Sequence, residues 1–263
     1  MSLLKILFTN NFYQISDIKI FKQECIFLKN KKSVKMKKIV VLSLGGSLIV
    51  PNEIDYKFLC RFKEVIRKHT SKYKFVVVCG GGSIARKYIK ALKKKGVSEK
   101  IQSMAGIAVT RLNARFMTYF FGRDANQGIP HDMKDVENLL KKHDVVFCGA
   151  LRYAAHETSD GTAAKLANFF RADFVNMTIV PGLYTKNPLE HKNAKFIPEI
   201  SWQKFYKKAH KIKYKPGQHF VLDQEASRII MKHRIKTYIV GKELNNFENV
   251  LKGKKFRGSV IEG

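Results

Sequence analysis

The stretch 75–90 constrains the fold of this chain most strongly, because it reads as a buried strand, a glycine turn and a helix. One phenylalanine and three valines open the stretch, and β-branched side chains favour an extended backbone. Gly80, Gly81 and Gly82 then allow a sharp bend, and the first turn of the next helix offers unpaired N–H groups to an anion. Arg86 lies beside this opening. The stretch therefore predicts an anion-binding loop, followed by a helix whose apolar face comprises Ile84, Tyr88, Ala91 and Leu92.

Read alone, this turn is compatible with three kinds of structure. Gly80, Gly82 and Ala85 fit the G-x-G-x-x-A fingerprint of dinucleotide-binding domains. A phosphate-binding kinase loop has the same ingredients, and a tight turn between a strand and a helix needs glycines even when it binds nothing. A dinucleotide site also needs an acidic residue about 20 positions further on, at the end of a second strand. Glu99 is the nearest such residue and follows a helix instead, which disfavours the dinucleotide interpretation.

A second glycine turn precedes the first one. The segment 39–90 reads as βαβα, because a strand that ends in Gly45, Gly46 and Ser47, and then a helix, come before the turn at 80–82. Parallel strands joined by a helix place both turns at the same edge of one sheet, where open α/β sheets bind their ligands. Two adjacent turns therefore favour a site that holds two phosphate groups close together.

Composition indicates a globular chain that binds anions. The 263 residues are 45% hydrophobic, which is enough for a large core. A total of 50 Lys and Arg against 21 Asp and Glu gives a net charge of +29, which suits nucleotides and would also suit nucleic acid. The lysines are spread along the whole chain and no nucleic-acid-binding module is visible, so we predict no specific nucleic-acid partner.

The cysteines indicate a reducing compartment. Cys25, Cys60, Cys79 and Cys148 are far apart, and they form neither a C-x-x-C pair nor, with histidines, a zinc pattern. We therefore expect a cytoplasmic location and no metal held by protein ligands. No apolar run approaches the ~20 residues that a membrane-spanning helix needs, so no membrane partner is predicted.

The chain divides near Met36. Residues 1–35 hold two short apolar patches separated by polar and charged residues, and they lack a signal-peptide pattern. Met36 opens directly into the first strand of the βαβα segment. We therefore expect 1–35 to be a disordered N-terminal appendage or the result of a misassigned start, and 36–263 to be one domain. The intact mass of the natively expressed protein distinguishes the two explanations.

The remaining chain continues the alternation of strands and helices. A long helix is predicted over 98–123, and its segment 110–114 brings polar groups into an apolar face, either for the site or as satisfied hydrogen bonds. Thr158, Ser159 and Asp160 can cap a helix and also place hydroxyls and a carboxylate at the carboxyl edge of a strand. Further strands are expected at 145–148, 173–179, 236–241 and 256–261, with helices at 134–142, 201–210 and after Asp223. The sum is a three-layer αβα sandwich with a largely parallel central sheet.

A series of short motifs occurs in order along the chain, at 44–48, 79–88, 106–114, 158–160, 182–188, 223–230 and 235–242. By their number and order they resemble the amino acid kinase superfamily and, within it, most closely the uridylate (UMP) kinases of the archaeal type. The pieces Gly-Gly-Gly-x-x-Ala-Arg-x-Tyr and Thr-Arg-x-Asn-Ala favour these over the carbamate, acetylglutamate and isopentenyl phosphate kinases. The resemblance runs from about Lys38 to Ile261 and implies the amino acid kinase fold.

The resemblance implies a reaction and a donor site. The γ-phosphoryl group of ATP would pass to UMP to give UDP and ADP, with Mg²⁺ carried on the ATP, and the enzyme would be a homo-oligomer, usually a hexamer. In matching positions, Gly45, Gly46 and Ser47 would hold the ATP phosphates. Tyr184 and Pro188 would border the ATP site.

The resemblance also implies an acceptor site. Gly81 and Gly82 would hold the phosphate of UMP, and Arg86 would grip it, because a planar guanidinium suits a phosphate. Thr158 would contact the nucleoside of UMP, and Asp160 would orient cationic or amide groups at the reaction centre.

This sequence departs from the family pattern at three positions. Many members have a lysine two residues before the first glycine turn, where this chain has Ser43, and Lys215 is the lysine expected to serve in its place. The acidic residue that usually binds the UMP ribose falls near Ser103, and the aspartate of the Asp-Gly-x-Tyr loop is Pro181. These departures leave open a kinase of another small phosphate or carboxylate, or a non-catalytic nucleotide-binding relative.

Overall fold

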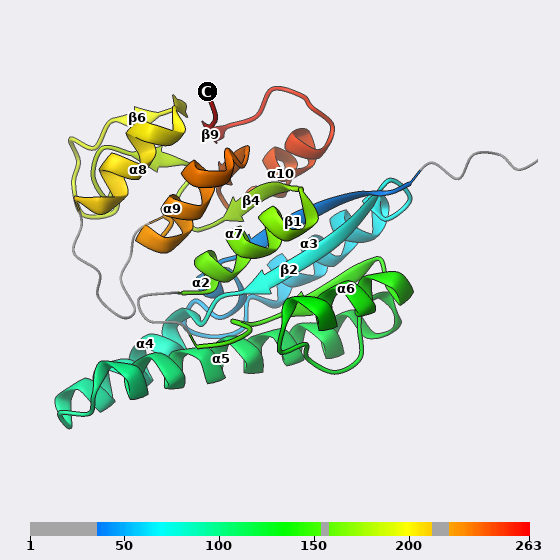
Figure 1. Cartoon of the computed structure of the whole chain (residues 1–263), viewed down its shortest axis with the longest axis horizontal. Coiled ribbons are helices and arrows are strands. Elements are labelled where there is room, and N and C mark those ends of the chain that lie inside the picture. The colour runs from blue at the N-terminus through cyan, green and yellow to red at the C-terminus, as the bar shows by residue number, and fades with distance from the viewer. Residues whose placement is uncertain (1–35, 154–157, 212–220) are drawn as a thin grey trace, which may run out of the picture. The chain divides into compact units, whose positions relative to one another are not determined.

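The protein is described by a computed structural model over residues 36–153, 158–211 and 221–263 (Figure 1), so the expected appendage at 1–35 lies outside the described residues. Lys37–Gly263 form one compact unit around a sheet of seven strands in the order β3-β2-β1-β4-β8-β9-β7. Neighbouring strands are parallel except β8 and β9, which confirms the largely parallel sheet. The strands are β1 Lys38–Leu44, β2 Tyr73–Cys79, β3 Val145–Cys148, β4 Asp173–Met177, β7 Glu199–Ile200, β8 Thr237–Val240 and β9 Gly258–Ile261.

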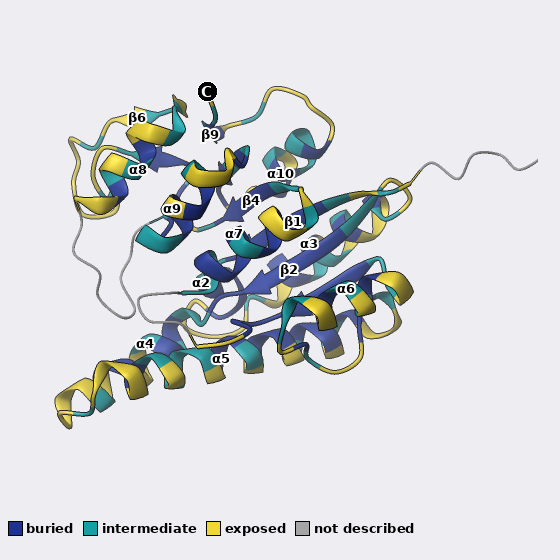
Figure 2. Ribbon diagram, viewed as in Figure 1, coloured by how far each residue is buried: buried dark blue, intermediate teal, exposed yellow. Residues whose placement is uncertain are grey.

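The central strands are buried on both faces because each is a nearly unbroken apolar run. In β1, Val40, Leu42 and Leu44 pack into one core and Val41 packs into the other. Successive side chains of a strand point to opposite faces, so the run supplies both cores at once. Helices must then cover both faces, as is usual for parallel sheets. Figure 2 shows the strands as the buried centre between partly exposed helices, and the expected three-layer sandwich is confirmed.

The helices divide between the two cores. One core takes apolar residues from α2, α3, α5 and α10, and the other takes them from α6, α7, α8 and α9. The helices are α2 Gly46–Ile49, α3 Tyr56–His69, α4 Gly82–Lys94, α5 Glu99–Phe121, α6 Met133–Lys142, α7 Ser159–Phe170, α8 Trp202–His210, α9 Gln224–His233 and α10 Leu244–Leu251. The elements that we did not predict include the short helix α2, the edge strand β7 and a small hairpin of β5 (Leu183–Tyr184) and β6 (Phe196–Ile197).

The prediction of which face of α4 is buried was wrong, because the buried face is rotated by part of a turn from the predicted one. Tyr88 is 55% exposed, whereas Ala85 and Ile89 are buried. The helix packs against α5, where a side chain at Gly106 would meet Ile89 Cδ1 at 3.3 Å. Residues four apart share a helix face, so Ala85 and Ile89 set the phase of α4 and turn Tyr88 outward.

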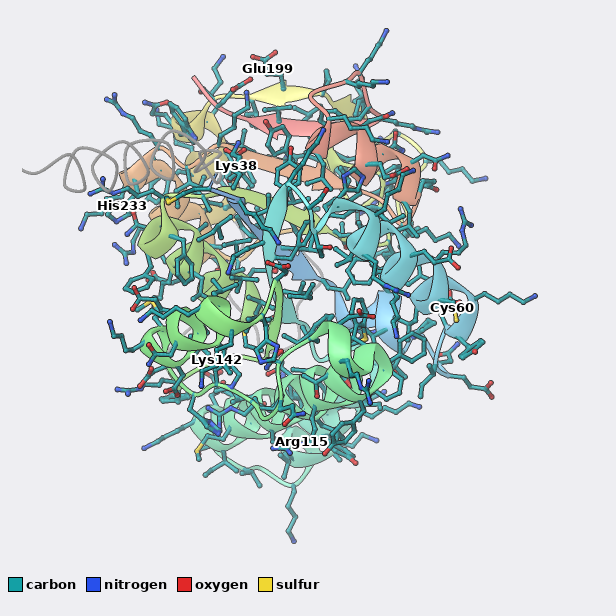
Figure 3. All side chains as sticks on the ribbon, turned by 90° about the vertical axis from the view of Figure 1, so that its right-hand side faces the viewer. Lys38, Cys60, Arg115, Lys142, Glu199 and His233 are labelled. Atoms are coloured by element: carbon teal, nitrogen blue, oxygen red, sulfur yellow. The ribbon has the colours of Figure 1, made fainter. Side chains whose placement is uncertain are left out.

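Charged side chains surround the domain. Figure 3 shows long nitrogen-tipped side chains around the whole outline, with Lys142 and Arg115 labelled among them. The basic residues are therefore spread over the surface, as their spacing in the sequence suggests. Within the described ranges, no helix combines the length and the apolar character that crossing a bilayer would need.

A polar cluster joins the end of α3 to α10. Glu248 Oε1 lies 3.0 Å from His69 Nε2, 3.3 Å from Lys68 Nζ and 3.4 Å from Lys252 Nζ. Tyr73, at the start of β2, donates its hydroxyl to the Leu251 carbonyl nearby. The hydrogen bond from His69, together with the two lysines, lowers the pKa of Glu248 to about 2. The cluster therefore stabilises the docking of α10 when Glu248 is ionised.

We expect Glu248→Gln to lower the melting temperature by about 3–6 °C at pH 7, because it removes charge-assisted hydrogen bonds from a shielded position. A lowered pKa in the folded state gives stability that is present above the ordinary value of 4.5 and is lost as the pH falls toward 2. The difference from the unmodified protein should therefore shrink between pH 7 and pH 3 in thermal denaturation. Glu137→Gln removes an exposed pair with Lys134 and serves as the control with little effect. A difference that does not depend on pH would contradict this account.

Candidate active site

The two glycine turns touch each other. The Gly80 N–H donates to the Leu44 carbonyl at 2.9 Å, and a Cβ built on Gly46 would lie 2.1 Å from the Gly82 nitrogen. Gly82 has a φ of +63°, and a Cβ there would lie 2.5 Å from the Gly46 oxygen. Neither position has room for a side chain. The turns lie side by side at the carboxyl edge of β1 and β2, as their places after adjacent parallel strands predicted.

Each turn opens a helix with free backbone donors. Gly46 and Ser47 begin α2, and Gly82 and Ser83 begin α4. The N–H groups of a first helical turn have no partner within the helix, so they can bind an anion. Gly45 differs, because its N–H donates to the Met177 carbonyl at 2.9 Å. Gly45 can therefore let a phosphate approach, but its N–H is already used.

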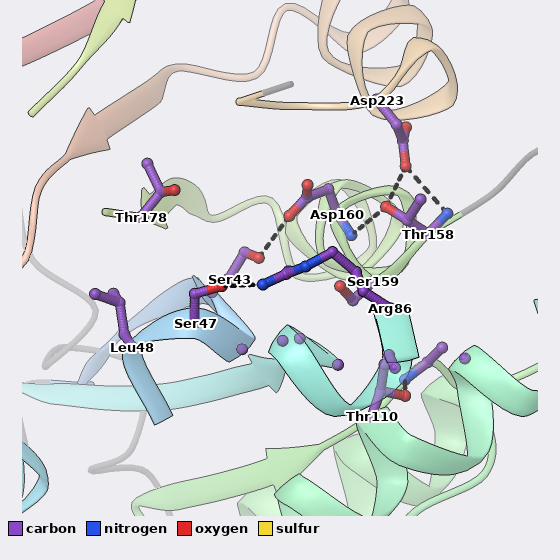
Figure 4. Close-up of a pocket in the computed structure, with 18 of the residues that line it drawn as sticks. Ser43, Ser47, Leu48, Arg86, Thr110, Thr158, Ser159, Asp160, Thr178 and Asp223 are labelled. Carbon is purple, nitrogen blue, oxygen red and sulfur yellow. Dashed lines mark hydrogen bonds between the residues drawn. The ribbon is translucent and has the colours of Figure 1, made fainter. Parts of the chain in front are cut away.

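A cavity lies over both turns (Figure 4), lined by residues from α4, α5, the end of β4 and the start of α7. The predicted site residues that line it are Gly45, Gly46, Ser47, Gly81, Gly82, Arg86, Thr158 and Asp160. Tyr184 and Pro188 are not among its lining residues, since Tyr184 lies in β5 and packs against Phe196. Lys215 lies outside the described residues. The predicted roles of these three residues stay predictions.

The polar segment of α5 supports the turns. Asn113 Nδ2 donates to the Gly80 carbonyl at 2.7 Å, and Thr110 Oγ1 accepts the Ala150 N–H at 2.9 Å. Arg111 Nε donates to the Ala150 carbonyl at 3.0 Å. Of the two explanations that the sequence left open, the structure shows satisfied hydrogen bonds, and these bonds hold the loops around the cavity. Thr110 also lines the cavity itself.

Thr158 and Asp223 form the wall of the cavity beside α7. Thr158 caps α7 and accepts the Asp160 N–H at 3.2 Å, while its own hydroxyl donates to Asp223 Oδ2. Asp223 also accepts the N–H groups of Thr158 and Ala226, so it caps α9 as predicted. The Thr158 hydroxyl is thus held by Asp223 here, and its contact with a nucleoside stays a prediction.

Asp160 is a partly buried carboxylate that lines the cavity. Burial, and then the charge of Asp223, raise its pKa to about 7, and a hydrogen bond from Ser43 opposes this shift only in part. Ser43 Oγ donates to Asp160 Oδ1 at 2.7 Å. Burial also raises the pKa of Asp223, but the donors around Asp223 oppose that rise. Asp160 is therefore the carboxylate that can accept further ligands in the cavity.

Ser43 and Asn176 are site residues that the sequence reasoning missed. Ser43 was treated only as a lost lysine, yet its hydroxyl binds Asp160. Asn176 lies in β4, lines the cavity and donates to the Val221 carbonyl. Both residues could have been recognised from the sequence as polar residues near the carboxyl end of a mainly apolar strand, where a site was expected.

Arg86 supplies positive charge to the cavity. Its Nη2 donates to Ser47 Oγ at 3.3 Å, so a residue predicted on the acceptor side touches one predicted on the donor side. The side chain is partly buried, and this burial lowers the pKa of the guanidinium, which remains charged at any physiological pH. Among the lining residues that the structure describes, Arg86 is the one with a permanent positive charge.

The domain is similar in sequence to known proteins over almost its whole length. The family model described as "Amino acid kinase family" matches residues 38–241. A uridylate kinase of Thermococcus kodakarensis is 32% identical over 225 residues, which cover 85% of this chain and 99% of that protein. A uridylate kinase of Archaeoglobus fulgidus is 36% identical over 225 residues, which cover 84% of this chain and 99% of that protein.

Solved structures match the same fold. The crystal structure of uridylate kinase from Archaeoglobus fulgidus has a TM-score of 0.73 at 36% identity, and the match covers 86% of this chain and 100% of that one. The structure of UMP kinase from Ureaplasma parvum has a TM-score of 0.69 at 19% identity, with 87% of this chain and 100% of that one covered. The second likeness concerns the fold alone. The sandwich predicted from the sequence is therefore a known kinase fold.

We expect Asp160→Asn to raise the free energy of unfolding above that of the unmodified protein, both measured without ligands. This gain should grow as the pH rises from 5 to 8.5. A raised pKa in the folded state means that folding favours the protonated form, so the contribution of Asp160 to stability falls as the pH passes from about 4 to about 7. The asparagine stays neutral and can still accept the hydrogen bond from Ser43. The expected gain at pH 8.5 is a few kcal/mol, which is roughly 5–10 °C in melting temperature.

Thermal denaturation of both proteins across this pH range measures the effect. Asp132→Asn is the control, because the Asp135 N–H and Arg152 lower the pKa of Asp132, so this substitution should destabilise the protein by an amount that does not change between pH 5 and 8.5. A stability difference between Asp160→Asn and the unmodified protein that stays constant from pH 5 to 8.5 would show that folding does not raise the pKa of Asp160.

Proposed function

Because the chain belongs to the amino acid kinase family, we propose that it is a nucleoside monophosphate kinase that transfers the γ-phosphoryl group of ATP to UMP, giving ADP and UDP. The relatives that match it over nearly their whole lengths are named uridylate kinases. The observation that carries the proposal is the direct contact of two glycine turns, both opening a helix, under one cavity. This arrangement suits two phosphate groups that react with each other.

To catalyse phosphoryl transfer, a protein mainly has to position two phosphates and to offset their negative charge. On the donor side, we assign Gly45, Gly46 and Ser47 to the ATP phosphates, with N–H donation from the last two. On the acceptor side, we assign Gly81 and Gly82 to the phosphate of UMP. The turns are in contact, so the two phosphates would lie close together. The backbone then supplies the positioning.

Asp160 is assigned to the reaction centre. Its carboxylate faces the cavity and accepts a hydrogen bond from Ser43, which leaves oxygen lone pairs for a further partner. Mg²⁺ prefers oxygen ligands and is commonly held by substrate phosphates plus one or two carboxylates. Within the described part of the chain no cluster of three or more metal-binding side chains occurs. Asp160 therefore fits a Mg²⁺ that arrives with ATP, and the ion would supply charge neutralisation between the phosphates.

Four further residues complete the assignment. Arg86 is assigned to the phosphate of UMP and Thr158 to its nucleoside, since both line the cavity. Tyr184 and Pro188 are assigned to the border of the ATP site on the strength of the motif at 182–188.

A panel of monophosphates in a coupled ADP-release assay tests the function. We expect ADP to form from ATP when UMP is added, with Asp160→Asn lowering kcat by on the order of a hundredfold because an electrostatic group at the reaction centre is neutralised. Asp135→Asn, on the surface helix α6, is the control that retains activity.

The same assay separates the alternatives. Turnover with another phosphate or a carboxylate, but not with UMP, would replace the substrate. Calorimetric binding of ATP without turnover on any acceptor would instead indicate a non-catalytic relative.

We further propose that the protein is a homo-oligomer. The support is the run of exposed large apolar side chains along α5, which soluble surfaces rarely leave uncovered. These residues are Ile101, Met104, Leu112 and Tyr119. Sedimentation velocity measures the assembly, and we expect a species larger than the 30.2 kDa monomer, with Leu112→Lys shifting it to smaller forms. A monomer at micromolar concentration would contradict the proposal.

A further inference from the structure

The peptide group between Gly80 and Gly81 can take either of two orientations in the second glycine turn. Neither residue has a Cβ, so the backbone on both sides of this peptide is less restricted than elsewhere, and the peptide plane can turn over at low cost. Both residues line the cavity. One orientation presents an N–H group to an anion in the cavity, and the reverse orientation presents a carbonyl oxygen, which repels it. The orientation therefore decides whether this part of the turn can bind a phosphate.

Asn113 holds the carbonyl group of this peptide. Its Nδ2 donates to the Gly80 carbonyl oxygen at 2.7 Å, and its side chain is only 3% exposed. Asn113 lies in α5, which packs against α4, and it does not line the cavity. Because an amide that is buried without a partner is costly, the hydrogen bond is strongly preferred over its loss. The bond therefore keeps the Gly80 carbonyl turned toward α5.

The N–H group of Gly81 points the other way. No cis peptide bond occurs in the described ranges, and a trans peptide places its C=O and N–H on opposite sides. Since the Gly80 carbonyl faces Asn113, the Gly81 N–H faces away from Asn113. Within the described residues this N–H donates no hydrogen bond, and Gly81 is the N-cap of α4 without a side-chain cap. The Gly81 N–H is therefore available to a ligand in the cavity.

We infer that Asn113 is a positioning residue for the acceptor phosphate, which acts through the Gly80 carbonyl and keeps the Gly81 N–H directed at the phosphate of UMP. The inference rests on the proposed function, which assigns Gly81 to that phosphate. Asn113 itself touches no substrate. The donor turn is held by β4 instead, since the Gly45 N–H donates to the Met177 carbonyl at 2.9 Å. Loss of the Asn113 amide should therefore weaken the acceptor side far more than the donor side.

Separate binding measurements test this role. Isothermal titration calorimetry would give the Kd of UMP and of ADP, each alone in the same Mg²⁺ buffer, for the unmodified protein and for Asn113→Leu. Leucine has about the same size as asparagine but cannot donate a hydrogen bond. We expect the Kd of UMP to rise by about tenfold or more, as loss of a hydrogen bond to a charged group does, and the Kd of ADP to change by no more than about twofold. In steady-state assays, the KM for UMP should rise more than the KM for ATP.

A matched control comes from the same helix. Thr118 is 5% exposed, and its hydroxyl donates to the Arg115 carbonyl at 2.8 Å, within α5. Thr118→Val therefore removes a buried polar group of α5 that does not contact the turn. This substitution should leave the Kd of UMP and the Kd of ADP within about twofold of the unmodified protein. If it weakens UMP as strongly as Asn113→Leu does, the effect belongs to the stability of α5 and the inference falls.

Two further measurements keep the test decisive. If circular dichroism shows that Asn113→Leu does not fold, Asn113→Ser takes its place, because the serine hydroxyl is too short to reach the Gly80 carbonyl and should give the same selective loss of UMP affinity. The unmodified protein also reports on the proposed hydrogen bond directly. In a ¹H–¹⁵N spectrum, the amide proton of Gly81 should shift downfield when UMP binds. A Gly81 amide that does not respond to saturating UMP would overturn the inference.

The outcomes separate the inference from the function. If Asn113→Leu weakens UMP and ADP by the same factor, or weakens neither, Asn113 does not position the acceptor phosphate. If it weakens ADP alone, the second turn does not serve the acceptor and the inference falls as well. An unmodified protein that neither binds UMP nor forms UDP would overturn the proposed function. One that forms UDP while Asn113→Leu keeps its UMP affinity would overturn the inference alone.

Discussion

The contact between the two glycine turns is the constraint on which the rest of the structure depends. With a Cβ on Gly46 only 2.1 Å from the Gly82 nitrogen, the turns meet backbone to backbone. Such an approach requires β1 and β2 to be adjacent and in register, and Leu44 indeed lies opposite Cys79 at their carboxyl ends. The buried strands, the helices on both faces and the support from α5 all fix that register. The backbone of the two turns therefore sets the shape of the cavity floor, and the side chains around it set its charge.

Two carboxylates line the cavity, the buried Asp223 and the partly buried Asp160, and their hydrogen bonds give them different roles. Asp223 receives N–H and hydroxyl donors from Thr158 and Ala226, so its lone pairs are used in holding α7 to α9. Asp160 receives the Ser43 hydroxyl, and burial, followed by the charge of Asp223, raises its pKa to about 7. Their hydrogen bonds distinguish the two residues, because a carboxylate with several donors is held in place, whereas one with a single donor can still accept a ligand.

The sequence was sufficient for the fold and for the two turns, because these depend on local patterns. Apolar runs, glycines and helix caps identified β1, β2, α4 and the cap at Asp223, each from a few neighbouring residues. The contact of Ser43 with Asp160 joins residues 117 positions apart, so no local pattern could indicate it. The phase of α4 was missed for a related reason, since Tyr88 and Ile89 are both apolar and only packing against α5 decides which is buried. The support that Asn113 gives to Gly80 was likewise visible only as an unexplained polar residue.

The serine at position 43 changes where positive charge can enter the site. A lysine there would place a cation at the end of β1, directly beside Asp160 and near Asp223, where the carboxylates would compete with phosphates for it. With Ser43 in this place, Asp160 accepts a hydrogen bond from a neutral hydroxyl, and its pKa of about 7 means that it binds a proton readily. Within the described structure, the guanidinium of Arg86 has no carboxylate partner. An unpaired guanidinium retains its full attraction for an incoming anion. The positive charge of the described cavity wall therefore comes from α4, beside the turn at Gly81 and Gly82, and not from the end of β1.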